Sequence, residues 1–190
     1  MARSDDRPQR RSIRLVGFDY CEPAVYFVPL CTYQRICLFG QIAEGEIHLN
    51  DAGRIVQQEW LRSAELRKEV VLDRFVTLPN HVHGLIILTH AALLGANELG
   101  TPASNMPVGT SVGRPLTRSP KSLGSFVAGF KSAATRRVND AIGQAGTPIW
   151  QRNYWEHIVR DDEALARIRT YIDTNPMRWH LDRENPDYRT

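Results

Sequence analysis

Two histidines separated by one residue, His81 and His83, stand in the stretch "LPNHVHGLIIL" at positions 78–88. The stretch is rich in aliphatic residues and predicts a strand, and alternate side chains of a strand point to the same face. The two imidazoles would therefore converge on one divalent ion and leave its other positions open for water and substrate oxygens. An isolated H-x-H pattern is more often one core histidine beside an unrelated one, so the pair does not settle the chemistry.

A second pair of candidate residues, Tyr171 and Asn175, lies in "YIDTNP" near the end of a predicted helix. Residues four apart share one face of a helix, so the phenol could be a nucleophile and the amide oxygen a third metal ligand. A free phenol has a pKa near 10, so its attack on a phosphodiester would need a metal ion or basic groups nearby. Equally, Tyr171 fits a core aromatic with its hydroxyl at the surface, and Asn175 fits a helix stop.

Positive charge is concentrated in the second half of the chain. Residues 114–160 hold eight basic and two acidic side chains, a net +6, whereas the whole chain carries +3. Such a concentration is typical of a protein that neutralises a phosphate backbone, although a solvated basic face has the same composition. The candidates for DNA contact are Arg10, Arg11, Arg14, Lys131, Arg136, Arg137 and Arg152.

The pattern of the remaining sequence predicts an α+β domain. Alternating and β-branched runs predict strands, and apolar residues repeating every three to four positions predict helices. We expect strands at 12–17, 24–33, 70–79, 81–88 and 149–160, a hairpin at 39–50, and helices within 50–68, 122–143 and 161–175. Strands in this order with helices between them favour a two-layer sandwich with a mainly antiparallel sheet.

Length and composition indicate one globular domain. The chain has 190 residues, 42% of them apolar, and no run that approaches the roughly 18 apolar residues of a membrane span. We expect a basic arm at 1–11, a domain at 12–180 with a mobile Gly/Pro-rich loop at 95–121, and a tail at 181–190. The polar N-terminus and three cysteines without a C-x-x-C pair favour a reduced, cytoplasmic protein that binds no zinc and no membrane.

Several stretches, taken together and in order, resemble one family. The sequence "YFVPLCTYQR", "LPNHVHGLI", "GFKSAATRRVN", "IWQRNYWEHIVR" and "YIDTNPMRW" is similar to that of the REP-associated tyrosine transposases. These are domesticated relatives of the single-tyrosine HUH transposases of bacterial insertion sequences, and REP denotes a repetitive extragenic palindrome. The resemblance runs from about Arg11 to Trp179, apart from the loop at 95–121.

This resemblance implies a fold and a site. The fold would be the ferredoxin-like palm of HUH nucleases, also described as RRM-like, with the HUH motif on a central strand. His81 and His83 would be metal ligands, Tyr171 the catalytic tyrosine, and Asn175 the polar residue that completes the metal site, where insertion-sequence relatives carry Gln. The metal would be Mg²⁺ or Mn²⁺.

The resemblance also implies a reaction. The enzyme would cleave and rejoin single-stranded DNA at hairpins formed by REP palindromes, through a 5′-phosphotyrosine intermediate, as in transposition. It would act near the nucleoid, and a monomer is favoured over a homodimer. Two alternatives stay open: a catalytically silent hairpin-binding protein of the same fold, and a metal-dependent hydrolase of small molecules. One departure from the family pattern, Pro29 in place of Thr, is expected to interrupt strand pairing.

Overall fold

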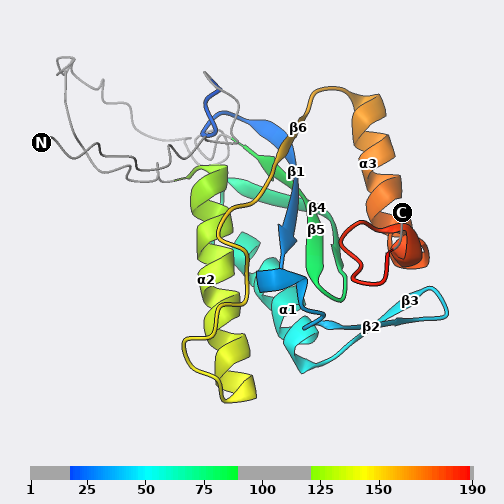
Figure 1. Ribbon diagram of the computed structural model, residues 1–190. Helices are drawn as coiled ribbons and strands as arrows, with labels where there is room; N and C mark the ends of the chain where they lie inside the picture. The colour runs from blue at the N-terminus through cyan, green and yellow to red at the C-terminus, as the bar shows by residue number, and fades with distance from the viewer. Residues whose placement is uncertain (1–17, 90–120, 189–190) are drawn as a thin grey trace, which may run out of the picture.

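The computed structural model describes residues 18–89 and 121–188. Within these ranges the helices and strands, in chain order, are β1 (Ala24–Cys31), β2 (Gly40–Ala43), β3 (Glu46–Leu49), α1 (Asp51–Glu65), β4 (Val70–Thr77), β5 (His81–Leu88), α2 (Leu123–Ile142), β6 (His157–Val159) and α3 (Asp162–Thr174), with short 3₁₀ turns η1 (Tyr33–Arg35) and η3 (Pro176–Leu181) (Figure 1). The expected arm, the strand at 12–17 and the loop up to residue 120 lie outside the described residues.

The main sheet has four strands in the order β4-β5-β1-β6, and every neighbouring pair is antiparallel. Strands β2 and β3 form a separate hairpin. The succession β1-α1-β4-β5-α2-β6 is the split βαβ connectivity of ferredoxin-like folds. The prediction of an α+β domain with an antiparallel sheet is therefore confirmed, and β5 is an inner strand of that sheet.

Helices cover both faces of the sheet (Figure 1). Helices α1 and α2 pack on one face, where Trp60, Phe126 and Phe130 meet apolar side chains of β1 and β5. Helix α3 packs on the other face, where Ile172 meets Phe27 and the other members of a smaller core. The structure therefore has three layers where two were expected, because β5 is buried on both faces and each face requires a cover.

Side chains of β5 alternate between these two cores, as the sequence predicted. Val82 and Ile86 lie in the core beneath α1 and α2, whereas Leu85 lies in the core beneath α3. Gly84 faces α1, and a Cβ atom placed there would lie 2.3 Å from Cζ2 of Trp60. The missing side chain of Gly84 therefore makes room for the indole of Trp60 against the strand.

The two longer helices differ in how well their buried faces were predicted. In α2 the sequence predicts an apolar stripe at every fourth position, Phe126, Phe130, Ala134 and Val138, and all four residues are buried. The apolar periodicity of the segment at 50–68 predicts a buried face of Ile55, Trp60, Leu61 and Leu66. Trp60 is buried and Ile55 packs against the core, but Leu61 and Leu66 are 56% and 75% exposed, because Ala52 and Val56 complete the face that packs. Asn50 and Asp51 are both candidate caps by residue type, and the structure has Asn50 as the cap, its side chain accepting from the Gly53 N–H at 3.0 Å.

Helix α3 begins and ends where the sequence predicts. The Asp161 side chain accepts from the Ala164 N–H at 2.7 Å, and the helix stops before Pro176. The strand expected before it is much shorter, because only His157–Val159 pairs with β1, apart from an isolated bridge between Thr32 and Trp150. No helix among the described residues is long and apolar enough to cross a membrane.

Candidate active site

The two histidines of the H-x-H pattern lie side by side on the face of β5 that α3 covers. His81 is 0% and His83 4% exposed, and their ring centroids are 4.5 Å apart. Burial lowers the pKa of His81 to about 4, with the Asp182 carboxylate acting in the opposite direction. Burial, and then His81, lower the pKa of His83 well below its usual range. Both imidazoles are therefore neutral at pH 7, as metal coordination requires.

Asn80 fixes which nitrogen of His81 carries its proton. The Asn80 amide nitrogen donates to the main-chain oxygens of Arg35, at 3.0 Å, and Glu184, at 2.6 Å. Its Oδ1 lies 2.9 Å from His81 Nδ1 and can only accept, so Nδ1 is the protonated nitrogen. The Nε2 lone pair of His81 is then free, and this buried nitrogen has no hydrogen-bond partner among the described residues.

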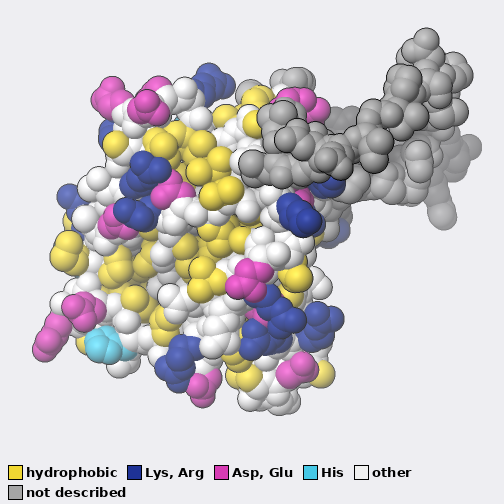
Figure 2. Space-filling view, turned by 180° about the vertical axis from the view of Figure 1, so that it is seen from behind, with side chains coloured by type: hydrophobic (Ala, Val, Ile, Leu, Met, Phe, Trp, Pro, Cys, Tyr) yellow, Lys and Arg dark blue, Asp and Glu magenta, His cyan; other side chains and the backbone are white. Residues whose placement is uncertain are grey.

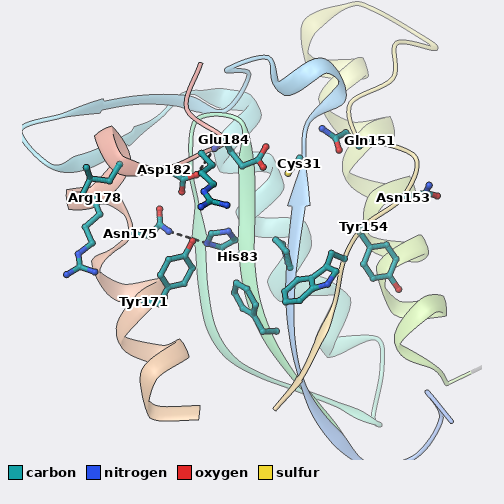
Figure 3. Close-up of a pocket in the computed structure, with 15 residues that line it drawn as sticks. Cys31, His83, Gln151, Asn153, Tyr154, Tyr171, Asn175, Arg178, Asp182 and Glu184 are labelled. Carbon is teal, nitrogen blue, oxygen red and sulfur yellow. Dashed lines mark hydrogen bonds between the residues drawn. The ribbon is translucent and has the colours of Figure 1, made fainter. Parts of the chain in front are cut away.

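Helix α3 brings the other predicted pair to the same place (Figure 3). The Asn175 side chain is buried, and its Nδ2 lies 3.4 Å from His83 Nδ1. The Tyr171 ring is 42% exposed, and its centroid lies 5.2 Å from that of the His83 ring. The structure thus brings together all four residues that the sequence selected, two from β5 and two from α3 and its C-cap, a helix that begins 74 positions after the strand ends (88 to 162).

The phenol of Tyr171 is protonated at neutral pH in this state. Its pKa is raised by partial burial and then by the carboxylate of Asp182, while a hydrogen bond with the Asn175 amide acts the other way. An anionic phenolate would therefore require added positive charge at the site. A bound cation is the simplest source of that charge.

Residues expected to form a tail, 181–184, instead contact the site. Asp182 Oδ2 lies 3.7 Å from His81 Nε2, and the Asp182 side chain is only 9% exposed. Glu184 accepts from Asn80 through its main-chain oxygen and pairs with Arg35 Nε at 2.7 Å through its carboxylate. Sequence reasoning missed these residues, because they follow the recognisable motifs and carry no spacing signal of their own.

The donor atoms fit a divalent cation. His81 Nε2 and Asn175 Oδ1 are both buried and have no hydrogen-bond partner among the described residues. Imidazole nitrogens together with an amide oxygen form a mixed donor set of the kind that holds such ions. No group of three His, Cys, Asp or Glu side chains in the described ranges is arranged for a metal ion, so the set depends on the amide of Asn175.

His83, Tyr171 and Asn175 line a hollow of about 620 Å³, the central hollow. One wall carries Tyr171, Asn175 and Arg178 from α3 and η3, and Figure 3 shows Gln151 and Tyr154 on the opposite wall. The opposite wall comes from the irregular segment 151–155, which joins the Trp150 bridge to β6. Substrate entering the hollow would contact both walls.

Two proteins of Haemophilus influenzae are similar to this chain in sequence. An uncharacterised protein of Haemophilus influenzae strain Rd is 37% identical over 177 residues, which cover 91% of each protein. Another protein of that strain, a proposed REP-associated tyrosine transposase, is 53% identical over 30 residues, 16% of this chain and 17% of that one. No protein-family model matches the chain.

A solved structure shares the fold. The structure of a REP-associated tyrosine transposase bound to a REP hairpin matches with a TM-score of 0.54, covering 89% of this chain and 76% of that chain at 17% identity. In its fold, and in one short stretch of sequence, the chain is similar to REP-associated tyrosine transposases. The resemblance seen in the sequence motifs is thereby confirmed.

The candidate DNA-binding residues separate into groups. Lys131, Arg136 and Arg152 line a second hollow of about 580 Å³, the α2 hollow, between α2 and residues 145–152. Arg137 instead pairs with the buried carboxylate of Glu59 on α1. Arg10, Arg11 and Arg14 lie outside the described residues.

The face seen from behind the view of Figure 1 carries both signs of charge where its described residues are visible. Figure 2 shows that face with Lys and Arg interspersed with Asp and Glu around a central area of hydrophobic side chains. Mixed charges of this kind attract a phosphate backbone weakly. The basic lining of the α2 hollow is therefore the stronger candidate for a backbone contact among the described residues.

Proposed function

We propose that this protein is a metal-dependent endonuclease and strand transferase that acts on single-stranded DNA at REP-type hairpins. The observation that carries the proposal is that Tyr171 and Asn175 line one hollow with His83, and that the His81 ring lies 4.5 Å from the His83 ring. A matched structure of the same fold is described as bound to a REP hairpin, which supports hairpin DNA as the partner.

The site residues have distinct roles in the proposed cleavage. A bound Mg²⁺ or Mn²⁺, held by His81, His83 and Asn175, would supply positive charge to the scissile phosphate and the leaving oxygen. Tyr171 loses its proton and attacks phosphorus in line. The Tyr171 Oη–P bond forms as the P–O3′ bond breaks, and the 3′ oxygen leaves and takes up a proton.

Rejoining reverses these bond changes. The DNA 5′-phosphate stays esterified to Tyr171, which conserves the energy of the phosphodiester bond. A DNA 3′-hydroxyl then attacks that phosphorus, loses its proton and releases the phenol of Tyr171. The site therefore needs no nucleotide cofactor to reseal the strand.

The α2 hollow is the proposed contact for the hairpin backbone. Arg136 and Arg152 carry guanidinium groups that can bind phosphate oxygens in a bidentate manner, and Lys131 adds a third positive charge. Its ammonium also donates to the main-chain oxygen of Gln151, which joins α2 to the wall of the central hollow. Residues 151–155 would therefore lie between the hairpin backbone bound in the α2 hollow and the single strand bound in the central hollow.

A labelled hairpin oligonucleotide with single-stranded flanks tests the proposal. Incubation with Mn²⁺ or Mg²⁺ should give a protein–DNA adduct that survives denaturing electrophoresis and retains a label placed at the 3′ end. Tyr171→Phe should abolish the adduct, whereas Tyr154→Phe, on the opposite wall, should retain it. An adduct with Tyr171→Phe would refute the nucleophile. Hairpin binding without an adduct in either ion would favour the silent binding protein.

A further inference from the structure

An exposed indole, Trp155, projects beside the candidate active site. We propose that Trp155 is a stacking platform for one nucleobase of the single strand that flanks the scissile phosphate. This inference rests on the proposed function, because it names how the same site would hold its strand. Four observations support it: a bulged backbone, a proline that causes the bulge, an exposed aromatic ring, and hydrogen-bonding side chains beside that ring.

The segment that carries Trp155 bulges away from the sheet. Strand β1 meets β6 at the Phe27–His157 pair and meets the chain again at the Thr32–Trp150 bridge. Between these pairings β1 has the four residues 28–31, whereas the facing segment has the six residues 151–156. Two extra residues cannot stay in register, so the segment leaves the sheet plane and forms a wall of the central hollow.

Pro29 explains why the bulge occurs at this place. The main-chain oxygen of Cys31 accepts from the Gln151 N–H at 3.0 Å, so odd-numbered residues of β1 direct their backbone groups toward the β6 side. Pro29 is one of these residues and has no N–H to donate. Pairing with β5 on the other edge continues through Pro29, opposite His83. The predicted interruption by Pro29 therefore occurs on one side of β1 only.

Trp155 is held by aromatic neighbours yet remains half exposed. Its ring lies 6.5 Å from that of Phe27 at 74°, and 5.8 Å from that of His157 at 18°. The side chain is 51% exposed, although tryptophan is usually much more buried. Phe27 also lies 6.0 Å from the Tyr171 ring, so the indole and the candidate nucleophile flank one phenylalanine.

The surroundings of Trp155 suit a nucleobase. Gln151 and Asn153 line the same hollow and can hydrogen-bond to base edges, while Arg178 on the far wall can meet a phosphate. The base of the bulge is fixed by two hydrogen bonds of Gln151, from its N–H to Cys31 and from Lys131 to its oxygen. A DNA strand cleaved at Tyr171 must cross this wall, and aromatic stacking is the common way to hold an unpaired base.

Binding measured without catalysis tests the inference. Tyr171→Phe protein in chelator is titrated with two hairpins, one with single-stranded flanks and one blunt. Adding Trp155→Ala should weaken binding of the flanked hairpin by about tenfold and leave the blunt hairpin unchanged. Trp155→Phe should restore most of the loss. Leu61→Ala, at an exposed site on α1, should change neither affinity.

An abasic scan of the flank locates the stacked base. One abasic position should weaken binding to the Trp155-containing protein and have little further effect with Trp155→Ala. An equal loss for both hairpins, no loss for either, or abasic effects that persist unchanged in Trp155→Ala would overturn the inference. These outcomes do not depend on adduct formation, so failure of the proposed cleavage and failure of the stacking platform remain distinguishable.

Discussion

The Oδ1 atom of Asn80 accepts the Nδ1 proton of His81 at 2.9 Å. The same amide donates to main-chain oxygens of Arg35 and Glu184, residues that lie 149 positions apart (35 to 184). Asn80 therefore joins a candidate metal ligand to the turn after β1 and to the C-terminal residues. Partners of this kind orient metal-ligating histidines and typically change metal affinity by about 10- to 100-fold.

Substitutions of Asn80 should separate orientation of His81 from support of the backbone. Asn80→Ala removes the acceptor and both donors, so Mn²⁺ affinity should fall at least about tenfold and stability should also fall. Asn80→Asp keeps the acceptor for His81 but loses both donors, so affinity should be largely retained while stability falls. Calorimetric Mn²⁺ titration and urea unfolding, both on Tyr171→Phe protein, measure the two effects. An equal loss of affinity in both variants would contradict the assigned tautomer.

The lowered pKa of each histidine predicts how stability depends on pH. In chelator, the unfolded chain binds protons on His81 and His83 near pH 6.5, whereas the folded protein resists protonation of His81 until about pH 4 and of His83 well below its usual range. The unfolded state therefore binds more protons as pH falls, and the free energy of unfolding should decrease by about 1.4 kcal/mol per pH unit for each histidine.

Urea unfolding between pH 7.5 and pH 5 measures this slope. His83→Asn should make the slope shallower by the contribution of one histidine, whatever its effect on stability at pH 7.5. Saturating Mn²⁺ should raise stability by nearly the same amount across this range, because the folded histidines are already neutral and protons do not compete with the ion. A slope unchanged by His83→Asn would contradict the buried neutral state.

Local spacing predicted the parts of the fold and site that depend on neighbours in sequence. Alternation along β5 placed His81 and His83 on one face, and the i, i+4 relation placed Tyr171 with Asn175. The family resemblance then indicated that the two pairs belong together. The stripe of α2 was equally visible, since its four apolar residues repeat every four positions and all face one core.

Features that depend on strand register could not be predicted in the same way. The bulge that exposes Trp155 follows from which edge of β1 Pro29 faces, and that edge is fixed only by pairing with a segment more than 100 residues away. The partner of Arg137 is likewise set by helix packing. In α1, Leu61 and Leu66 looked like core residues because hydrophobicity alone does not show which side of a helix meets the sheet.

Two glycine substitutions should have opposite effects on stability. At Gly84 an added Cβ would lie 2.3 Å from Trp60, which stacks at 4.6 Å on Phe75 and cannot move freely, so Gly84→Ala should destabilise by about 1–3 kcal/mol. At Gly129, exposed in α2, an added Cβ meets nothing within 4 Å, so Gly129→Ala should stabilise by about 1 kcal/mol.

Thermal and urea unfolding of the two glycine variants provide the measurement. Gly84 also adjoins His83, so its substitution should weaken Mn²⁺ binding, whereas Gly129→Ala should leave binding unchanged. If Gly84→Ala were as stable as the unmodified protein, the close packing of Trp60 on β5 would be disproved.

Adjacent arginines on α2 provide a matched pair for separating DNA binding from stability. Arg136 is exposed and lines the α2 hollow, whereas Arg137 bridges to α1 through the carboxylate of Glu59, which is 4% exposed, and through Gln58. Arg137→Ala leaves the Glu59 charge buried without its partner and should destabilise by roughly 2 kcal/mol. Arg136→Ala should leave stability unchanged but weaken hairpin binding and lower the slope of log affinity against log salt by about one.

Salt-dependent hairpin titrations and urea unfolding of both variants measure these effects. If Arg137→Ala lowered the salt slope at unchanged stability, Arg137 would be a phosphate contact and its pairing with Glu59 would be incidental.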